Sequence, residues 1–195
     1  LILHHKNDVT IIDTRNKQEF AQGFIPNSIN IQNNKAFSNW AGWILDYHKP
    51  FILIVAKDQL EDVTRKLMRI GLDQAIGYIT PQSLQTVGIK LDQQEIIDFN
   101  EMNTALNNPN AQILDVRNES EYQAGHLPHA THVFVGTLLE NLDQIDPSKQ
   151  LYLHCQSGDR ATIAMSLLDR AGIKNIKNYS PGMKEWVEKN GTLIK

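Results

Sequence analysis

The chain has 195 residues, of which 41% are hydrophobic and 21% charged, as in an ordinary globular protein. Its 19 Lys and Arg residues against 22 Asp and Glu give a net charge of −3, so it lacks the basic surplus typical of proteins that bind nucleic acid or anionic membranes. Its longest apolar runs fall far short of the roughly 20 residues that a membrane-spanning helix needs.

Short apolar runs alternate with polar turns along the chain. Each is four to six residues long and partly β-branched, as buried parallel strands are; they cover residues 9–12, 51–55, 112–116 and 151–154. Residues 160–171 carry apolar residues at helical spacing and stop at Gly172, which predicts a helix with a C-terminal glycine. This alternation predicts an α/β fold with a mainly parallel sheet flanked by helices.

The chain repeats itself with a period of about 102 residues. Residues 13–31 are similar in sequence to residues 115–133, residues 49–55 to 149–155, and residues 69–71 to 170–172. Six positions of the first pair coincide: Asp13/Asp115, Arg15/Arg117, Asn16/Asn118, Glu19/Glu121, Gly23/Gly125 and Pro26/Pro128. Turn formers and weak periodicity in residues 79–90 place the boundary between the copies near residues 80–92. We therefore predict two tandem domains, residues 1–88 and 89–195.

Cys155, the chain's one cysteine, follows the predicted strand 151–154 and begins the loop Cys155-Gln156-Ser157-Gly158-Asp159-Arg160, which leads into a helix. Ligand crevices of open α/β sheets lie at such carboxyl ends of strands. Backbone N–H groups and the helix dipole there favour an anion, and hence a thiolate. Arg160 would add a full positive charge, and Gly158 would allow a tight turn. The alternative is that Cys155 is a buried structural residue.

For the other polar residues we compare a functional role with a structural one. We expect Asp115, Arg117 and Glu121 to tie the first strand of their copy to its first helix, because their counterparts persist in the copy that has no cysteine. The three histidines of the loop 125–132 recur every third residue, but Gly125 and Pro128 make that segment a loop, so we expect no metal there. His154 should point away from the thiol side of its strand. No cofactor is expected.

Several separated motifs of the second copy arrive in the order found in one family. They are Leu-Asp-Val-Arg (114–117), Glu-Tyr-Gln-Ala-Gly-His-Leu-Pro-His-Ala (121–130), Cys-Gln-Ser-Gly-Asp-Arg (155–160) and Pro-Gly-Met-Lys-Glu-Trp (181–186). Residues 97–195 thereby resemble a rhodanese domain. The resemblance implies a sulfurtransferase in which Cys155 is the nucleophile and persulfide carrier, with Arg160 as its catalytic partner and Gln156, Ser157, Gly158 and Asp159 as the substrate cradle.

The resemblance also implies the reaction partners and leaves alternatives open. Thiosulfate or a low-molecular-weight persulfide would donate sulfur, and a thiol, sulfite or cyanide would accept it. Related phosphatases have a loop one residue longer between Cys and Arg, so cysteine phosphatase is a weaker alternative. A non-catalytic rhodanese-like binding module is another. The lone cysteine fits a reducing cytosol, so we expect a cytoplasmic location, with neither nucleic acid nor a membrane as partner.

The first copy departs from the family pattern at its counterpart of the cysteine loop. Val55 or Ala56 stands in the cysteine position, and residues 57–62 have no glycine, no arginine in register and additional carboxylates. We predict that this copy is an inactive rhodanese-like domain kept for packing, for shaping the mouth of the second site, or for docking.

The tandem arrangement resembles the carboxyl-terminal part of fusions in which a metallo-β-lactamase-fold persulfide dioxygenase precedes two rhodanese domains. The first residues, Leu1 to His5, contain neither an initiator Met nor a signal-peptide pattern. We therefore expect an upstream catalytic domain in the same polypeptide.

Overall fold

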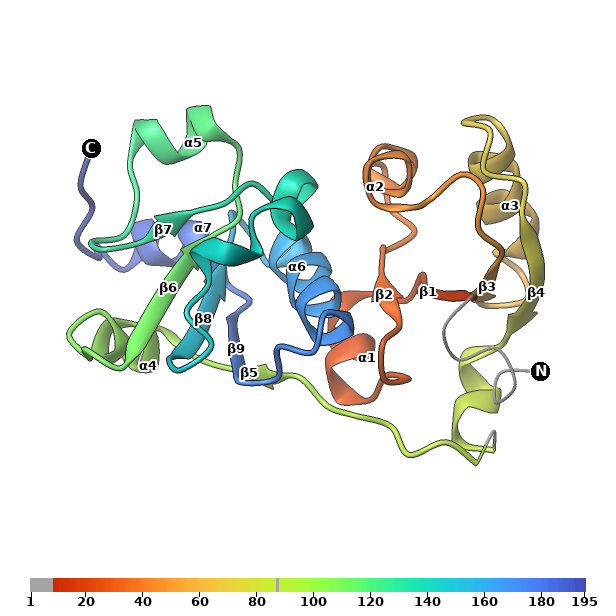
Figure 1. Ribbon diagram of the computed structural model, residues 1–195, viewed down its shortest axis with the longest axis horizontal. Coiled ribbons are helices and arrows are strands. Elements are labelled where there is room, and N and C mark those ends of the chain that lie inside the picture. The colour runs from red at the N-terminus through yellow and green to blue at the C-terminus, as the bar shows by residue number, and fades with distance from the viewer. Residues whose placement is uncertain (1–8, 87) are drawn as a thin grey trace. The chain divides into compact units, whose positions relative to one another are not determined.

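The computed structural model describes residues 9–86 and 88–195 (Figure 1). The chain divides into two compact units, residues 1–93 and 94–195. The boundary anticipated at 88/89 falls inside the first unit, because the backbone N–H and C=O of Asp92 pair with those of Phe24, both at 2.9 Å. Leu91 also packs against the cluster of Ile25, Ile54 and Leu84. Among the described residues, none of the helices combines the length and apolar character needed to cross a bilayer.

The first unit is a parallel sheet with flanking helices. Its strand order is β2-β1-β3-β4, with every neighbouring pair parallel. The strands are β1 (Thr10–Asp13), β2 (Ile29–Asn30), β3 (Phe51–Ile54) and β4 (Ala75–Ile79); the helices are α1 (Lys17–Gln22), α2 (Phe37–Ile44), α3 (Leu60–Met68) and the 3₁₀ helix η1 (Pro81–Gln85).

The second unit repeats this plan with one more strand, in the order β5-β9-β8-β6-β7, again all parallel. The strands are β5 (Glu95–Ile96), β6 (Ala111–Asp115), β7 (Thr131–His132), β8 (Gln150–His154) and β9 (Ile176–Tyr179); the helices are α4 (Phe99–Ala105), α5 (Glu119–Ala124), α6 (Asp159–Arg170) and α7 (Gly182–Glu188), with 3₁₀ helices η2 (Val135–Glu140) and η3 (Leu142–Gln144). The predicted α/β class is confirmed, and the carboxyl ends of all five strands meet at one edge.

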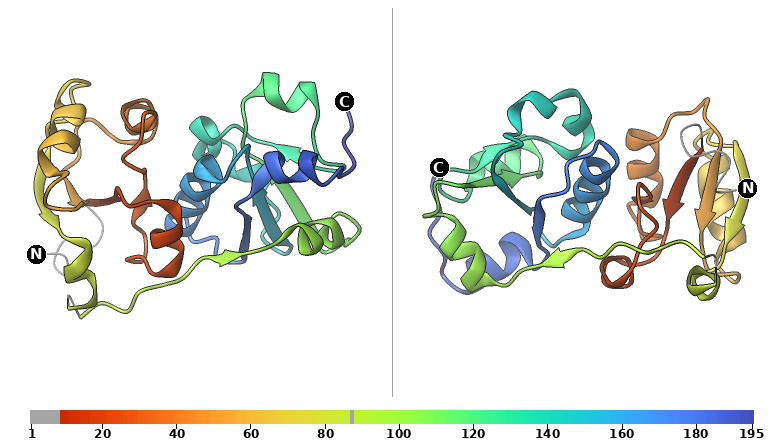
Figure 2. Two further views of the ribbon diagram at one scale, coloured as in Figure 1. Left: turned by 180° about the vertical axis from the view of Figure 1, so that it is seen from behind. Right: turned by 60° about the horizontal axis from the view of Figure 1, so that its bottom comes forward.

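The sheet of the second unit is covered on both faces. In the views of Figures 1 and 2, α6 lies on one face and α4 with α7 on the other. The core on the α4 and α7 side includes Met102, Ile113, Tyr152 and the fully buried Trp186, whose Nε1 donates to the carbonyl of Thr192 at 3.0 Å. These contacts fix α7 against the sheet, so its N-terminal end has a set position.

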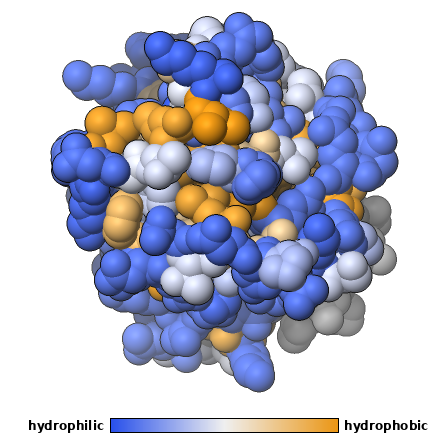
Figure 3. All heavy atoms as spheres, turned by 90° about the vertical axis from the view of Figure 1, so that its left-hand side faces the viewer, coloured by the Kyte–Doolittle hydropathy of each residue, from blue (hydrophilic) through white to orange (hydrophobic). Residues whose placement is uncertain are grey.

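Apolar side chains also reach the surface of the second unit. Figure 3 shows a band of them on a mostly polar face. Exposed apolar residues of α7 and the C-terminal segment include Val187, Leu193 and Ile194. That segment is held to the unit by a backbone bridge between Ile194 and His126.

Both units contain the same buried ion pair after their first long strand. Arg15 binds Asp13 at 2.6 Å and donates to the carbonyl of Gly23 at 2.7 Å. In the second unit Arg117 binds Asp115 at 2.7 Å and donates to the carbonyl of Gly125 at 2.9 Å. The carbonyls belong to the glycines that end α1 and α5. This confirms that the Asp and Arg of each copy tie strand to helix.

The residue paired with the aspartate across the sheet differs between the units. Ile54 is the register partner of Asp13, whereas His154 is the partner of Asp115, with its Nε2 3.7 Å from the Asp115 carboxylate. Burial raises the pKa of Asp13 despite Arg15. Burial also opposes the charge on Asp115, but His154 and Arg117 lower its pKa. Burial lowers the pKa of His154 itself to about 4, so this histidine is neutral at neutral pH.

His154 should make the second unit sensitive to acid. The unfolded chain takes up its proton near the usual 6.5, but the folded chain only near pH 4. Stability therefore rises with pH across this window and is lost as the pH falls through it, by about 3 kcal/mol in total. His154→Ile, which copies Ile54, should remove this dependence. The free energy of unfolding is measured by urea denaturation at each pH. Trp186 fluorescence follows the transition in a background in which Trp40 and Trp43 are replaced by Phe. Identical pH profiles for parent and variant would contradict the assignment.

Candidate active site

Cys155 lies where the sequence places it, at the carboxyl end of β8. The short loop that follows reaches Gly158, the N-terminal cap of α6, which has a φ of +92°. The Gly158 N–H donates to Cys155 Sγ at 3.1 Å, and Cys155 is only 1% exposed. The sulfur therefore sits against a backbone donor at the N-terminal end of a twelve-residue helix, a position that favours negative charge.

The loop is oriented by the first turn of α7. Met183 N–H donates to the carbonyl of Cys155 at 2.9 Å, and Lys184 N–H donates to the carbonyl of Gln156 at 3.1 Å. In a planar trans peptide the N–H points opposite to the C=O. The N–H groups of Gln156 and Ser157 therefore point away from the first turn of α7.

Two glycines permit this close approach. Gly182 has a φ of +67°, and a Cβ there would lie 2.4 Å from the carbonyl oxygen of Cys155. A Cβ on Gly158 would lie 2.4 Å from the carbonyl oxygen of Ser180. The loop and the N-terminal end of α7 can touch only because both positions lack side chains. The role of Gly182 was not recognised from the sequence.

Arg160 is bound to a carboxylate. Its Nη1 and Nη2 lie 2.5 and 2.8 Å from the two carboxylate oxygens of Glu121, which also accepts the Asn118 N–H at 3.1 Å. The guanidinium holds the pKa of Glu121 below its usual value. The full positive charge expected from Arg160 beside Cys155 is therefore matched by a negative one. Glu121, expected to tie the first strand of its copy to the first helix, instead caps α5 at Asn118 and contacts Arg160 in the first turn of α6.

The other predicted cradle residues differ in their exposure. Gln156 and Ser157 are exposed, and Asp159 is partly exposed in the first turn of α6. His154 is fully buried and close to Asp115. The catalytic role of Cys155 and Arg160 and the substrate-binding role of Gln156, Ser157, Gly158 and Asp159 stay predictions.

The loop histidines form an aromatic stack. Tyr122 lies between His126 and His132, with ring centroids 3.7 and 4.6 Å away. The third histidine, His129, has a φ of +60°. Within residues 9–86 and 88–195, no group of His, Cys, Asp and Glu side chains is arranged to hold a metal ion.

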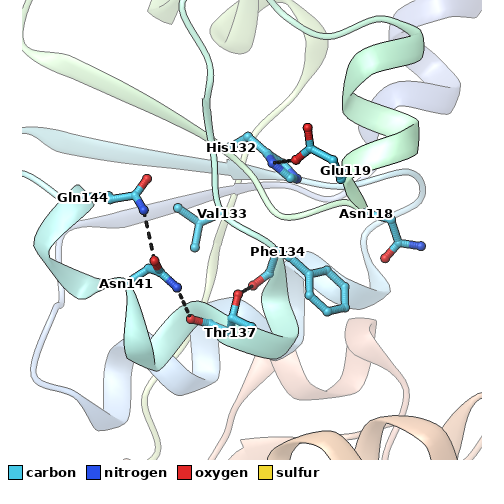
Figure 4. Close-up of a pocket in the computed structure, with 8 residues that line it drawn as sticks. All are labelled: Asn118, Glu119, His132, Val133, Phe134, Thr137, Asn141 and Gln144. Atoms are coloured by element: carbon cyan, nitrogen blue, oxygen red, sulfur yellow. Dashed lines mark hydrogen bonds and ion pairs between the residues drawn. The ribbon is translucent and has the colours of Figure 1, made fainter.

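A cavity of about 430 Å³ opens beside β7, the edge strand of the sheet (Figure 4). Its lining includes Glu119 of α5, His132 of β7, Phe134 and Thr137. In the cavity wall, Glu119 Oε2 lies 3.0 Å from His132 Nδ1. The Asn141 side chain donates to the Thr137 carbonyl at 2.8 Å. Sequence patterns give no sign of this cavity, because Asn118 and Glu119 are distant in sequence from its other lining residues, which lie between His132 and Gln144.

The counterpart of the cysteine loop in the first unit is occupied by a polar network. Lys66 binds Asp62 at 2.7 Å and Asn33 at 2.8 Å, and Asn33 donates to Gln59 and Asp62. Lys66 also lowers the pKa of Asp62. Val55 and Ala56 supply no thiol. This arrangement agrees with the prediction that the first copy is inactive, which stays a prediction.

Comparisons with known proteins match both copies. The family model described as "Rhodanese-like domain" matches residues 2–80 and 98–189. In *Bacillus subtilis*, the putative sulfur carrier protein YrkF is 32% identical over 77 residues, covering 40% of this chain and 42% of YrkF. The putative sulfurtransferase YtwF of the same organism is 32% identical over 74 residues, covering 38% of this chain and 71% of YtwF.

A relative with another activity also matches. The tRNA uridine(34) hydroxylase of *Hamiltonella defensa* is 32% identical over 99 residues, covering 48% of this chain and 28% of the hydroxylase. The chain thus spans less than half the length of YrkF and of this hydroxylase. Similarity to this family does not fix one activity.

Replacing Gly182 by Ala should displace the cysteine loop. Gly172→Ala is the matched control, because Gly172 has a φ of +91° but a Cβ there would meet nothing within 4 Å. The control should lose about 1–2 kcal/mol of stability through backbone strain alone. Gly182→Ala should lose about 1–3 kcal/mol more through the clash with the Cys155 carbonyl. It should also change the rate at which iodoacetamide alkylates Cys155. Equal losses and equal alkylation rates in the two variants would contradict this.

Proposed function

Because the chain belongs to the rhodanese-like domain family, we propose that it is a sulfurtransferase that carries sulfane sulfur as a persulfide on Cys155. The observation that carries the proposal is the position of the chain's one thiol, between the end of β8 and the start of α6 and 3.1 Å from the Gly158 N–H. The carbonyls of Cys155 and Gln156 accept hydrogen bonds from the first turn of α7, so the peptide N–H groups that follow them point away from that turn. Negative charge on a persulfide at Cys155 would be favoured by the Gly158 N–H and by the N-terminal end of α6.

The relatives support this reaction class to different degrees. YrkF and YtwF are named as a putative sulfur carrier and a putative sulfurtransferase. The tRNA uridine(34) hydroxylases belong to the same comparison, so the family alone does not decide the chemistry. The lone thiol at a helix N-terminus favours sulfur transfer, since it provides a nucleophile and donors for its charge without a cofactor.

The proposed reaction has two displacement steps. The Cys155 thiolate forms a bond to the outer sulfur of thiosulfate, the S–S bond of thiosulfate breaks, and sulfite leaves with its electron pair. An acceptor thiolate, sulfite or cyanide then attacks the outer sulfur of the Cys155 persulfide, and Cys155 leaves as the thiolate. A low-molecular-weight persulfide would donate in the same way and leave as a thiolate. Loop N–H groups would stabilise the charge in both steps.

The remaining assignments are part of the proposal. The first unit would serve a non-catalytic role. The reaction would take place in the cytoplasm, where thiols stay reduced.

Cys155→Ser should abolish sulfur loading while leaving the fold intact. Serine is close to cysteine in size, and its hydroxyl forms no persulfide. Intact mass after incubation with thiosulfate should show one added sulfur atom on the parent chain and none on the variant, and cyanide should remove that atom. Full thiosulfate:cyanide turnover by the Ser variant would refute the mechanism.

A fragment of residues 94–195 should load sulfur as the full chain does. It contains all the elements of the site, from β5 to α7, and with roughly 100 residues it is large enough to bury its own core. Trp186 fluorescence reports whether the fragment is folded, and intact mass reports the persulfide. A folded fragment without persulfide would show that the first unit takes part in the chemistry.

A further inference from the structure

Arg160, the arginine of the cysteine loop, forms an ion pair with Glu121. The two side chains make a two-point contact at 2.5 and 2.8 Å, and they are 14% and 29% exposed. The loop itself contains one basic residue, Arg160, and one acidic residue, Asp159. Together with Glu121, these groups carry a net charge of −1 before any charge on Cys155 is counted.

The Glu121 carboxylate is held in place from two sides. Asn118 N–H donates to one oxygen at 3.1 Å, and Arg160 contacts both. Arg160 also keeps the pKa of Glu121 below the usual 4.5, so the carboxylate is charged at neutral pH. A two-point arginine–carboxylate pair of this kind fixes geometry as well as charge. An anion that approaches Cys155 therefore meets an arginine whose charge is already balanced by the Glu121 carboxylate.

Resting on the sulfur transfer proposed above, we propose that Glu121 sets the charge preference of Cys155, favouring sulfane donors with one negative charge or none over the thiosulfate dianion. An organic thiosulfonate or an organic persulfide is such a donor. With a thiosulfonate, the Cys155 thiolate takes the outer sulfur and a sulfinate leaves with the electron pair of the broken S–S bond. With a persulfide, the leaving group is a thiolate.

The first unit shows that helix capping alone does not require this ion pair. Glu19, the counterpart of Glu121, accepts from Asn16 Nδ2 at 2.6 Å, and its N–H donates to Asn16 Oδ1 at 2.9 Å. The first copy has no counterpart of Arg160 and no thiol. The contact between the glutamate and an arginine thus occurs in the copy that has a thiol, which is why we assign it to the chemistry of Cys155.

Glu121→Gln tests the proposal in the full chain. Glutamine keeps the size of the side chain and an oxygen for the Asn118 N–H, as capping boxes accept either residue. Glu19→Gln is the matched control, because it makes the same change where no sulfur is carried. The readout is the second-order rate constant for sulfur loading of Cys155, by intact mass, with thiosulfate and with methanethiosulfonate. These donors deliver the same outer sulfur but differ by one charge.

At low salt Glu121→Gln should raise the ratio of thiosulfate to methanethiosulfonate rate constants by about three- to tenfold, the effect of one charge at the edge of a site. Glu19→Gln should leave the ratio at the parent value. An unchanged ratio in Glu121→Gln would overturn the proposal. A lowered ratio would also overturn it, because Glu121 would then only position Arg160.

A second measurement separates this inference from the proposed function. Iodoacetate and iodoacetamide alkylate a thiolate by the same displacement of iodide but differ by one charge. Glu121→Gln should raise the ratio of iodoacetate to iodoacetamide rates on Cys155, even in a chain that accepts no sulfur. A parent chain that is alkylated but never loads sulfur would contradict the proposed function alone. An unchanged alkylation ratio would contradict the role of Glu121.

Discussion

The candidate site depends on two backbone hydrogen bonds, from the first turn of α7 to the carbonyls of Cys155 and Gln156. They turn the carbonyl oxygens of the loop toward α7, and so they turn the neighbouring N–H groups the other way. Without them α7 would no longer fix the orientation of the peptide groups that follow Cys155. The buried core that fixes α7, centred on Trp186, therefore supports the geometry of the cysteine loop at a distance.

Much of the fold can be read from local pattern, because β1, β3, β6 and β8 are short apolar runs and the repeat doubles their signal, whereas two-residue strands such as β5 and β7 have no such run. The position of Cys155 between β8 and α6 follows from the same reading. The Glu121–Arg160 contact does not, since 39 residues separate its partners and Glu19 suggests a purely structural role. The contact of Gly182 with the loop depends on a positive φ, which composition does not reveal. The unit boundary after Gln93 depends on backbone pairing between Phe24 and Asp92, which has no side-chain signature.

Comparing the two copies distinguishes the contacts that the fold requires from those found where the thiol is present. The Asp13–Arg15 and Asp115–Arg117 pairs have nearly the same geometry, so they hold strand to helix whether or not a cysteine is present. The differences lie at the ends of β3 and β8, where Ile54 occupies the position equivalent to His154 and the Asp62–Lys66 network occupies the counterpart of the cysteine loop. A copy can therefore keep its core without the thiol and its loop.

The same arrangement limits how the chemistry proposed for the second copy could be built into the first. After β4 the described part of the chain forms the 3₁₀ helix η1, Pro81–Gln85, whereas after β9 it forms α7, whose first turn binds the carbonyls of the cysteine loop. Transplanting residues 155–160 in place of 55–60 would supply the thiol, the glycine and the arginine, but not the helix that orients them. A site spread over two distant segments is thus hard to install, because a single local exchange cannot supply both.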